Sequence, residues 1–519
     1  MSEPTGSVVE GAQRAPAGRD SNRKVAKGAL WMVLARLADR SIAFVSTLIL
    51  ARLLVPADFG LVAMATAVIT MLELLKSFGF DIALIQRSSA ERRHFDTVWT
   101  FNIIAGLGVA LIMAAIAPAV ASFYKDPRLV PILLVLAIGS VITGFENVGV
   151  VAFRKELQFR REFWYQFLRR IAGFVCTIPL AFVIRGYWAL VIGTAISRVF
   201  GVALSYYMHP YLPKLSLKAS RDLLSFSGWI LATNVVQFVN TQSATFLIGK
   251  TAGPAPLGLF TLSYQIAGLP TNELAAPVNR AVFPAYARQA HDERALKRSY
   301  IRVMDFFAVF GFPAAVGLAL CAPLLVPLLL GDKWLDATPL VTILSLHGFL
   351  VAVGSNNHYL YLARGKPGWT TVLGTIYAAM LLPALILSSL KWGALGAAWA
   401  YLLTQLVFTP IYYAMVRRVL DVNIRDFFGI FHRPAIAVSV MCPVVITVMR
   451  LTNAAHSPRP QQVLALFGTV LAGAVTYVAA LLLVWAWESK PDGAEKDIGV
   501  LVRQRWVTWT TALNRGKGL

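Results

Sequence analysis

Apolar residues gather into long runs that recur along this chain from residue 28 to residue 487. A helix needs about 20 such residues to cross the roughly 30 Å hydrocarbon core of a bilayer, and each run has about that length. The pattern predicts an all-α polytopic membrane protein with about 14 transmembrane helices, and it leaves no room for a soluble catalytic domain. The runs cover residues 28–50, 59–82, 97–119, 128–152, 165–183, 187–207, 222–248, 257–283, 301–323, 338–362, 369–390, 394–416, 433–451 and 463–487.

Basic residues are distributed unevenly over the connections between these runs. One set of alternate connections, together with both tails, holds about 31 Lys and Arg residues, among them Arg92, Arg93, Arg160 and Arg161, whereas the other set holds about 9. Cytoplasmic loops carry the excess of basic residues in membrane proteins. The bias does not reverse along the chain, so it predicts an even number of spans with both termini in the cytoplasm.

The composition agrees with a membrane protein and excludes several other classes. The chain is 57% hydrophobic and 14% charged, whereas soluble domains carry about 25% charged residues. Its formal net charge of +22 does not indicate nucleic-acid binding, because the basic residues lie in short loops and not on one soluble face. Cys176, Cys321 and Cys442 each stand alone inside a predicted span, so neither disulfides nor a zinc site are expected.

The polar ends and the two sets of six helices suggest a division into segments. The first residues are polar and rich in Gly, Ala and Ser, and the run that follows is long enough to stay as a helix, so no cleavable signal peptide is expected. A surface helix and a disordered tail both suit residues 498–513. The expected segments are a disordered cytoplasmic tail (1–27), an N-terminal six-helix lobe (28–207), a C-terminal six-helix lobe (208–416), two additional transmembrane helices (417–487) and a cytoplasmic tail (488–519).

The two halves of the chain resemble each other. The segment Pro-Ala-Asp-Phe-Gly-Leu at 56–61 is echoed by Pro-Ala-Pro-Leu-Gly-Leu at 254–259, and Arg154-Lys155 is echoed by Arg364-Gly365-Lys366. These and other matches keep an offset of about 198 to 210 residues along the chain. Because each repeat holds an even number of helices, an axis along the membrane normal relates them, as in some transporters. The repeat predicts two pseudo-symmetric lobes around a central cavity.

Polar residues inside the predicted spans concentrate in the first and second helices and in their repeat partners, the seventh and eighth. Such residues usually face protein or water, because a charge at the bilayer centre costs about 3 kcal/mol. They could form local ion pairs, Asp39 with Arg36 and Glu73 with Lys76, and interhelical hydrogen bonds. Their repetition in four related helices favours a hydrophilic cavity. The candidate cavity residues are Arg36, Asp39, Arg40, Glu73, Lys76, Asn234, Gln237, Asn272, Glu273 and Arg280.

The charges of these residues indicate the chemistry of a substrate. Arg36, Arg40 and Arg280 would make the cavity cationic, which suits an anion, because a guanidinium donates two parallel hydrogen bonds to phosphate. Gly249-Lys250-Thr251 resembles the end of a phosphate-binding loop, but Ala244 stands where that motif needs glycine, so direct use of ATP is not expected. His347 and His358 are either proton relays or buried structural histidines.

Three motifs near the N-terminus resemble the opening of bacterial polysaccharide transporters. They are Lys27-Gly28-x-x-Trp31, Leu50-Ala51-Arg52-Leu53-Leu54-x-Pro56-x-Asp58-Phe59-Gly60 and Gly79-x-x-x-Ala83-x-Ile85-Gln86. The family is that of the Wzx-type flippases within the multidrug/oligosaccharidyl-lipid/polysaccharide exporter superfamily. The resemblance implies two six-helix lobes, alternating access and no catalytic activity. It also implies that arginines of the first and eighth helices line the cavity and are required, which carries onto Arg36, Arg40 and Arg280.

The resemblance implies a substrate and a location. The expected substrate is a polyprenyl-diphosphate-linked oligosaccharide, moved across the bacterial inner membrane for exopolysaccharide, capsule or lipopolysaccharide synthesis. We expect no cofactor and coupling to an H⁺ or Na⁺ gradient. Beyond the substrate and membrane lipids, the polymerase and other polysaccharide-assembly proteins are candidate partners, and nucleic acid is not one.

Two other functions remain as alternatives. A cation-coupled multidrug antiporter of the same superfamily would favour carboxylates over arginines in its cavity. A membrane enzyme of polysaccharide assembly would carry a sizeable external loop with catalytic residues. The longest external loop expected here, about 451–462, holds only His456 and Arg459 as candidates.

Overall fold

The computed structural model describes residues 38–74, 91–156, 158–219, 228–452 and 458–488. Within these ranges the regular structure is helical, without strands. The expected tails at 1–27 and beyond 488 lie outside the described residues, as does the segment at 498–513. The predicted all-α fold is confirmed.

The first six helices form one bundle. After the helix at 38–53, the chain turns at Val55 into the next helix, whose first turn Pro56 begins. Asp58 bonds back to the amide of Val55 and so closes a capping box at this start. The bundle consists of residues 38–53, α2 (Pro56–Glu73), α4 (Arg92–Tyr124), α5 (Leu129–Gly144), α7 (Phe159–Ile184) and α8 (Trp188–Met208).

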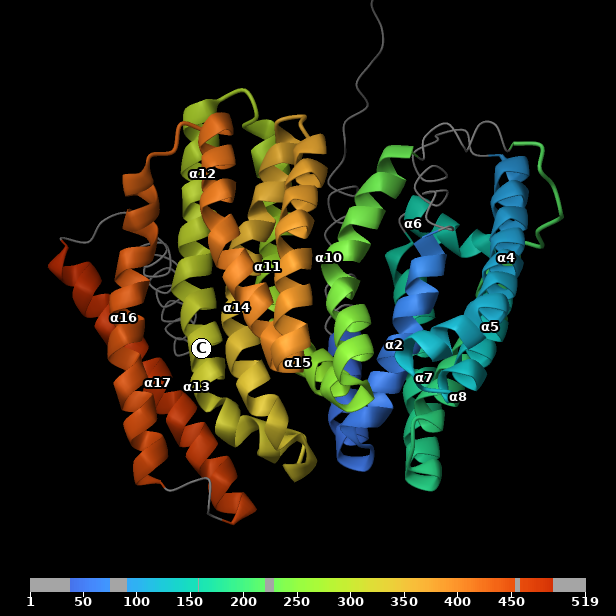
Figure 1. Ribbon diagram of the computed structural model, residues 1–519. Helices are drawn as coiled ribbons and strands as arrows, with labels where there is room; N and C mark the ends of the chain where they lie inside the picture. Colours follow the sequence, from blue (N-terminus) through green and yellow to red (C-terminus); the bar gives the residue numbers. More distant parts are fainter. Residues whose placement is uncertain (1–37, 75–90, 157, 220–227, 453–457, 489–519) are drawn as a thin grey trace, which may run out of the picture.

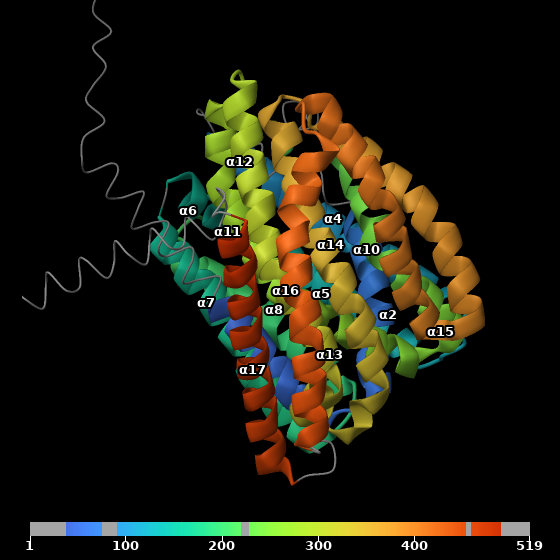
Figure 2. The ribbon, with the colours of Figure 1, turned by 90° about the vertical axis from the view of Figure 1, so that its left-hand side faces the viewer.

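The remaining helices form a second bundle and a hairpin at its outer edge. Figures 1 and 2 both place α16 and α17 beside α13. The second bundle contains α10 (Gly228–Ala252), α11 (Pro254–Arg288), α12 (Glu293–Phe306), η3 (Phe307–Gly311), α13 (Phe312–Leu329), η4 (Asp332–Ala337), α14 (Thr338–Ala363) and α15 (Gly368–Val419), and the hairpin contains α16 (Ile424–Leu451) and α17 (Arg459–Trp487).

Each of the fourteen predicted spans overlaps a helix in its described residues. Within the described part of the chain, nine helices are both long and apolar enough to cross a membrane. One of these, α15, contains two predicted spans, because the positive φ of 56° at Gly393 breaks it into two helices. The helix α5 is shorter, with 16 residues. The chain is therefore a multi-pass membrane protein.

The structure differs from the prediction at the end of the fourth span, which was expected to run to residue 152. The helix α5 stops at Gly144, and Asn147 begins the 3₁₀ turn η2 (Val148–Val151), which leads into the single turn α6 (Ala152–Lys155). The Asn147 side chain accepts a hydrogen bond from the amide of Gly149 and donates to the carbonyls of His209 and Tyr211. An asparagine that satisfies nearby backbone groups in this way competes with helix continuation.

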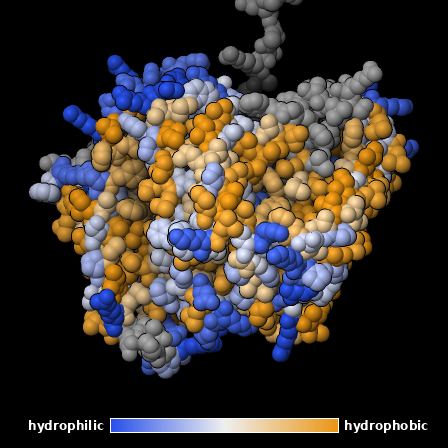
Figure 3. All heavy atoms as spheres, viewed as in Figure 1, coloured by the Kyte–Doolittle hydropathy of each residue, from blue (hydrophilic) through white to orange (hydrophobic). Residues whose placement is uncertain are grey.

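The two bundles converge at the lower end of the molecule in Figure 1, where α2, α10 and α11 meet. Buried residues of all three helices, among them Leu61, Ile248 and Leu257, belong to one hydrophobic core. On the visible surface, hydrophobic side chains cover much of the flanks, and hydrophilic side chains gather along the upper edge over α12 (Figure 3). This distribution fits a molecule whose flanks face lipid.

Candidate functional site

The first helix meets α11 through an ion pair between predicted site residues. The Arg40 Nε atom lies 3.0 Å from Oε1 of Glu273, and both side chains are partly exposed. Beside this pair lies a cavity of about 220 Å³, whose lining includes Thr47, Tyr264 and Gln265. Arg40 and Glu273 are both among the predicted site residues, and the structure brings their side chains together beside this cavity.

A larger cavity of about 620 Å³ lies inside the N-terminal bundle, between the first helix, α2, α7 and α8. Its charged lining residues are Asp39, Arg169, Arg170 and Arg198. Arg170 donates from Nε to Oδ1 of Asp39 at 2.6 Å and from Nη2 to Oδ2 at 3.2 Å. This fork ties α7 to the first helix, because a guanidinium binds a carboxylate through two parallel hydrogen bonds.

The other two arginines of this cavity have weaker partners. An Nη1 atom of Arg169 lies 3.6 Å from the Glu146 carboxylate, which also accepts a hydrogen bond from the Tyr165 hydroxyl. Arg198 donates to the carbonyl of Leu136 at 3.4 Å and interacts electrostatically with Glu73. Neither Glu73 nor Glu146 lines the cavity, so three arginines line it against one carboxylate residue, Asp39. Such a lining favours an anion.

The two cavities adjoin, since Ala43 and Thr47 line both of them. The first helix therefore lies between the two cavities, with Asp39 toward the N-terminal bundle and Arg40 toward α11. Together the cavities offer guanidinium groups for phosphate and amide and hydroxyl groups for a neutral polar ligand. Phosphate is matched by arginine in particular, because its oxygens accept the paired N–H groups.

The structure leaves other predicted site residues apart from these cavities. Asn234 and Gln237 lie on α10, and Arg280 is exposed on α11, but none of them lines either cavity. Asn272 lies within α11 between Thr271 and Glu273. Arg36 and Lys76 lie outside the described residues, so the local pairs expected for them stay predictions.

Sequence reasoning missed Arg169, Arg170 and Arg198. A signal was available, because each stands within or at the edge of an apolar run, where a charge usually has a functional or structural partner. Their partners come from other helices, so spacing along a single helix did not reveal the cluster.

The two candidate histidines, His347 and His358, lie on α14 of the C-terminal bundle. His347 is buried between the rings of Tyr264 and Tyr401, whose centroids lie 6.0 and 5.2 Å from its own, and its Nε2 atom has no hydrogen-bond partner. The Nδ1 atom of His358 lies 3.1 Å from the Thr370 hydroxyl. Among the residues that the structure describes, no three His, Cys, Asp or Glu side chains cluster as metal ligands.

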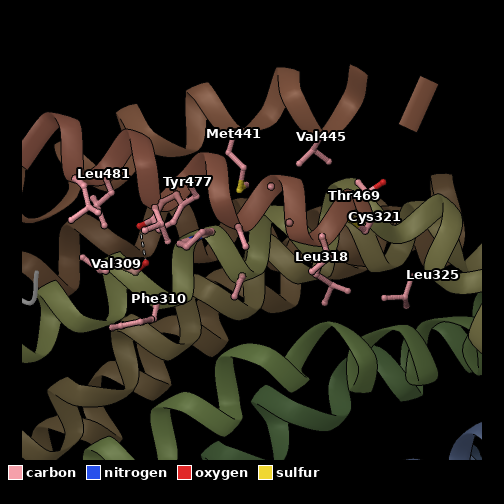
Figure 4. A pocket seen from close by; sticks show the side chains of 18 of the residues that line it. Val309, Phe310, Leu318, Cys321, Leu325, Met441, Val445, Thr469, Tyr477 and Leu481 are labelled. Carbon is pink, nitrogen blue, oxygen red and sulfur yellow. Dashed lines mark hydrogen bonds between the residues drawn. The ribbon is translucent and has the colours of Figure 1, made fainter. Parts of the chain in front are cut away.

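An apolar groove runs along the outer edge of the C-terminal bundle, between η3, α13, α16 and α17 (Figure 4). Its volume is about 880 Å³, and its lining is almost entirely hydrophobic, with Phe310, Leu318, Met441 and Leu481 among its residues. The Tyr477 hydroxyl donates to the carbonyl of Val309 at 2.7 Å across it, the bond drawn in Figure 4. A groove of this kind accommodates a hydrocarbon chain.

Comparison with known proteins identifies the family. A family profile described as "Polysaccharide biosynthesis protein" matches residues 49–339, more than half of the chain. The chain belongs to this family. Among its relatives, the lipopolysaccharide biosynthesis protein WzxC of Escherichia coli (strain K12) is 24% identical over 413 residues, covering 78% of this chain and 83% of WzxC.

Two further similarities bear on function and fold. The succinoglycan biosynthesis transport protein ExoT of Rhizobium meliloti (strain 1021) is 24% identical, over 89% of this chain and 93% of ExoT. The lipid II flippase MurJ, solved in an inward closed conformation, superimposes with a TM-score of 0.70 at 15% identity, over 88% of this chain and 99% of MurJ. The fold is thus that of a two-lobed transporter, as predicted.

Proposed function

We propose that this protein is a flippase that moves polyprenyl-diphosphate-linked oligosaccharides across the bacterial inner membrane for polysaccharide synthesis. The observation that carries the proposal is the pair of adjoining cavities. Arg40 lines the smaller cavity, and three arginines of the N-terminal bundle line the larger one. Membership of the polysaccharide biosynthesis family supports it. Alternating access between the two lobes would carry the polar part of the substrate across.

The separate parts of such a substrate match separate parts of the molecule. The diphosphate would bind the guanidinium groups, because charge-assisted hydrogen bonds to phosphate are among the strongest available in proteins. Sugar hydroxyls would bind Gln265 and Thr47 of the smaller cavity. The apolar groove between α13, α16 and α17 would hold the polyprenyl chain while the head group crosses.

The arginines favour this function over a multidrug antiporter. A cationic drug would meet Arg169, Arg170 and Arg198 with only Asp39 as a counter-charge on the larger cavity's wall. An enzyme of polysaccharide assembly would need catalytic groups, and the described residues supply only short connections at the helix ends. The polymerase that uses the exported units is a candidate partner at the outer face.

We expect the protein to cross the inner membrane with both termini in the cytoplasm. Reporter fusions after Asp126 and Lys333 should report an external location, and fusions after Arg160 and Arg294 a cytoplasmic one, because basic connections stay inside. A reversal of the reports from α10 onward would mean that the number of spans before it is odd. The repeat axis along the membrane normal would then be wrong as well.

Flipping by the purified protein tests the function directly. The protein is reconstituted in liposomes with a fluorescent polyprenyl-diphosphate-linked oligosaccharide, without ATP, and the label on the outer leaflet is quenched chemically. We expect flipping above that of protein-free liposomes, faster with an imposed H⁺ or Na⁺ gradient than without one.

The same liposomes separate the alternatives. An intact substrate that never changes leaflet, together with uptake of a cationic dye, would support the multidrug antiporter. A substrate that is lengthened or cleaved would support an enzyme. Flipping at equal rates with and without either gradient would contradict the coupling and leave a passive carrier.

A further inference from the structure

The two echoing segments of the repeat lie against each other where the lobes converge. A Cβ atom on Gly60 of α2 would overlap the carbonyl oxygen of Pro254, and one on Gly258 of α11 would overlap the carbonyl oxygen of Pro56. The two contacts are equivalent under the repeat, since both residue pairs keep the same offset of about 198 residues. The helices α2 and α11 therefore touch through their backbones, which only glycine permits at this distance.

Two basic side chains join the lobes beside this crossing. Arg52, at the end of the first helix, donates from Nε to the carbonyl of Leu329 at 3.0 Å and also donates to the carbonyl of Leu328, both at the end of α13. Lys250, near the end of α10, donates to the carbonyl of Phe123 at 2.5 Å, near the end of α4. The last carbonyls of a helix lack partners in their own helix and attract cations.

Arg52 and Lys250 are themselves a repeat pair, as are the helices that they cap. Each basic residue ends the first helix of its own lobe and caps the third helix of the other lobe. Residues of η4 in the C-terminal lobe add further bonds to the end of the first helix. Lys333 donates to the carbonyls of Arg52 and Leu54, and the Trp334 indole donates to the carbonyl of Ala51. The lobes are thus joined by a pseudo-symmetric pair of helix caps and by these further bonds from η4.

These bonds occur at one end of the molecule. Among the described residues, hydrogen bonds and ion pairs between the lobes extend from Arg40 and Glu273 to the end marked by Arg52 and Lys333. The ribbons converge at the same end (Figure 1). The basic-residue pattern predicts that this end faces outward.

We infer that Arg52, Gly60, Lys250 and Gly258 form an external gate, which is closed in this structure. The inference rests on the proposed flippase function, since a flippase must open toward the outside to release its substrate. The capping bonds lie at the surface, so water can replace them when the lobes part, and the gate is reversible. The glycines allow the backbone contact that seals it.

The rate at which a reagent reaches the cavity from outside shows whether the gate is open or closed, and this measurement does not require transport. Thr47, which lines both cavities, is replaced by cysteine in a chain whose Cys176, Cys321 and Cys442 are replaced by serine. Intact spheroplasts are then treated with a membrane-impermeant thiol reagent. We expect slow labelling in this background and labelling roughly tenfold faster with Gly60→Leu or Gly258→Leu, because the added side chain disfavours the closed state.

Control variants separate the gate from a general effect. Gly108 of α4 has open space where its Cβ would lie, so Gly108→Leu should leave the labelling rate unchanged. Arg52→Ala and Lys250→Ala should each accelerate labelling, by similar factors because the sites are equivalent, whereas Arg52→Lys and Lys250→Arg should largely restore the slow rate. Lys391→Ala, at another exposed lysine, should have no effect.

The outcomes distinguish the gate from the proposed function. Labelling that is no faster in the alanine variants than in Lys391→Ala would overturn the gate, even if the wild-type protein flips its substrate in liposomes. If the leucine variants fail to insert in the membrane, Arg52→Ala and Lys250→Ala still test the gate. Accelerated labelling, together with a wild-type protein that does not flip the substrate, would support the gate and contradict the flippase.

Discussion

Arg40→Ala is expected to reduce polymer export by about 100-fold or more while the protein still inserts in the membrane. The substitution removes a guanidinium that can hold phosphate through charge-assisted hydrogen bonds worth about 1.5 to 3 kcal/mol each. It also removes the ion pair of Arg40 with Glu273. Polymer output and the amount of lipid-linked repeat unit measure the effect, and the latter should accumulate because synthesis in the cytoplasm continues.

Two comparisons make this result specific. Arg40→Lys should restore export only in part, because an ammonium group cannot reproduce the paired donors of a guanidinium. Arg418→Ala, at an exposed arginine beyond the cavities, should export normally. Full export by Arg40→Ala would exclude a role for this residue in binding phosphate. The same experiment on Arg36 tests the prediction from the family resemblance.

Gly317→Trp is expected to abolish flipping of a long-chain substrate. Gly317 lines the apolar groove, and no atom beyond its chain neighbours and its own helix backbone lies within 4 Å of the position of its Cβ, so an indole can enter the groove without displacing the helix. Once there it would occupy the space proposed for the polyprenyl chain. Flipping in liposomes should fall to the level without protein for the long-chain substrate and remain for an analogue whose lipid has only a few carbons.

A matched tryptophan controls for the size of the new side chain. Gly468 of α17 also has open space at its Cβ position but does not line the groove, so Gly468→Trp should flip both substrates. Equal loss of the short-chain and long-chain substrates in Gly317→Trp would show that the groove does not serve the lipid. It would indicate a disturbance of α13 as a whole.

The positions of the helices followed from the sequence because hydropathy acts locally. Each predicted span needed only its own residues, and even the break at Gly393 fell between two separately predicted runs. The end of α5 did not follow. It depends on Asn147 reaching His209 and Tyr211, about 60 residues further along the chain, and no local pattern contains that contact.

The site was predictable only in part for the same reason. Spacing on the first helix offers Arg36, which lies outside the described residues, as a partner for Asp39, and it holds no sign that Arg170 of α7 binds the Asp39 carboxylate. Arg40 and Glu273 were both identified, although which residue each contacts depends on how the lobes meet. Helical periodicity defines a face of a helix, and the fold decides which neighbour covers that face.

The π-helical turn η3 joins α12 and α13 into one continuous rod, and it sets how the faces of the two helices are rotated relative to each other. An α-helix turns by about 100° per residue, so one additional residue in a turn rotates everything after it by about that angle. The charged helix α12 and the groove-lining helix α13 therefore direct their faces independently of each other. Removing one residue from 307–311 would turn Leu318 and Cys321 away from α17, and the groove would lose one wall although every helix remained in place.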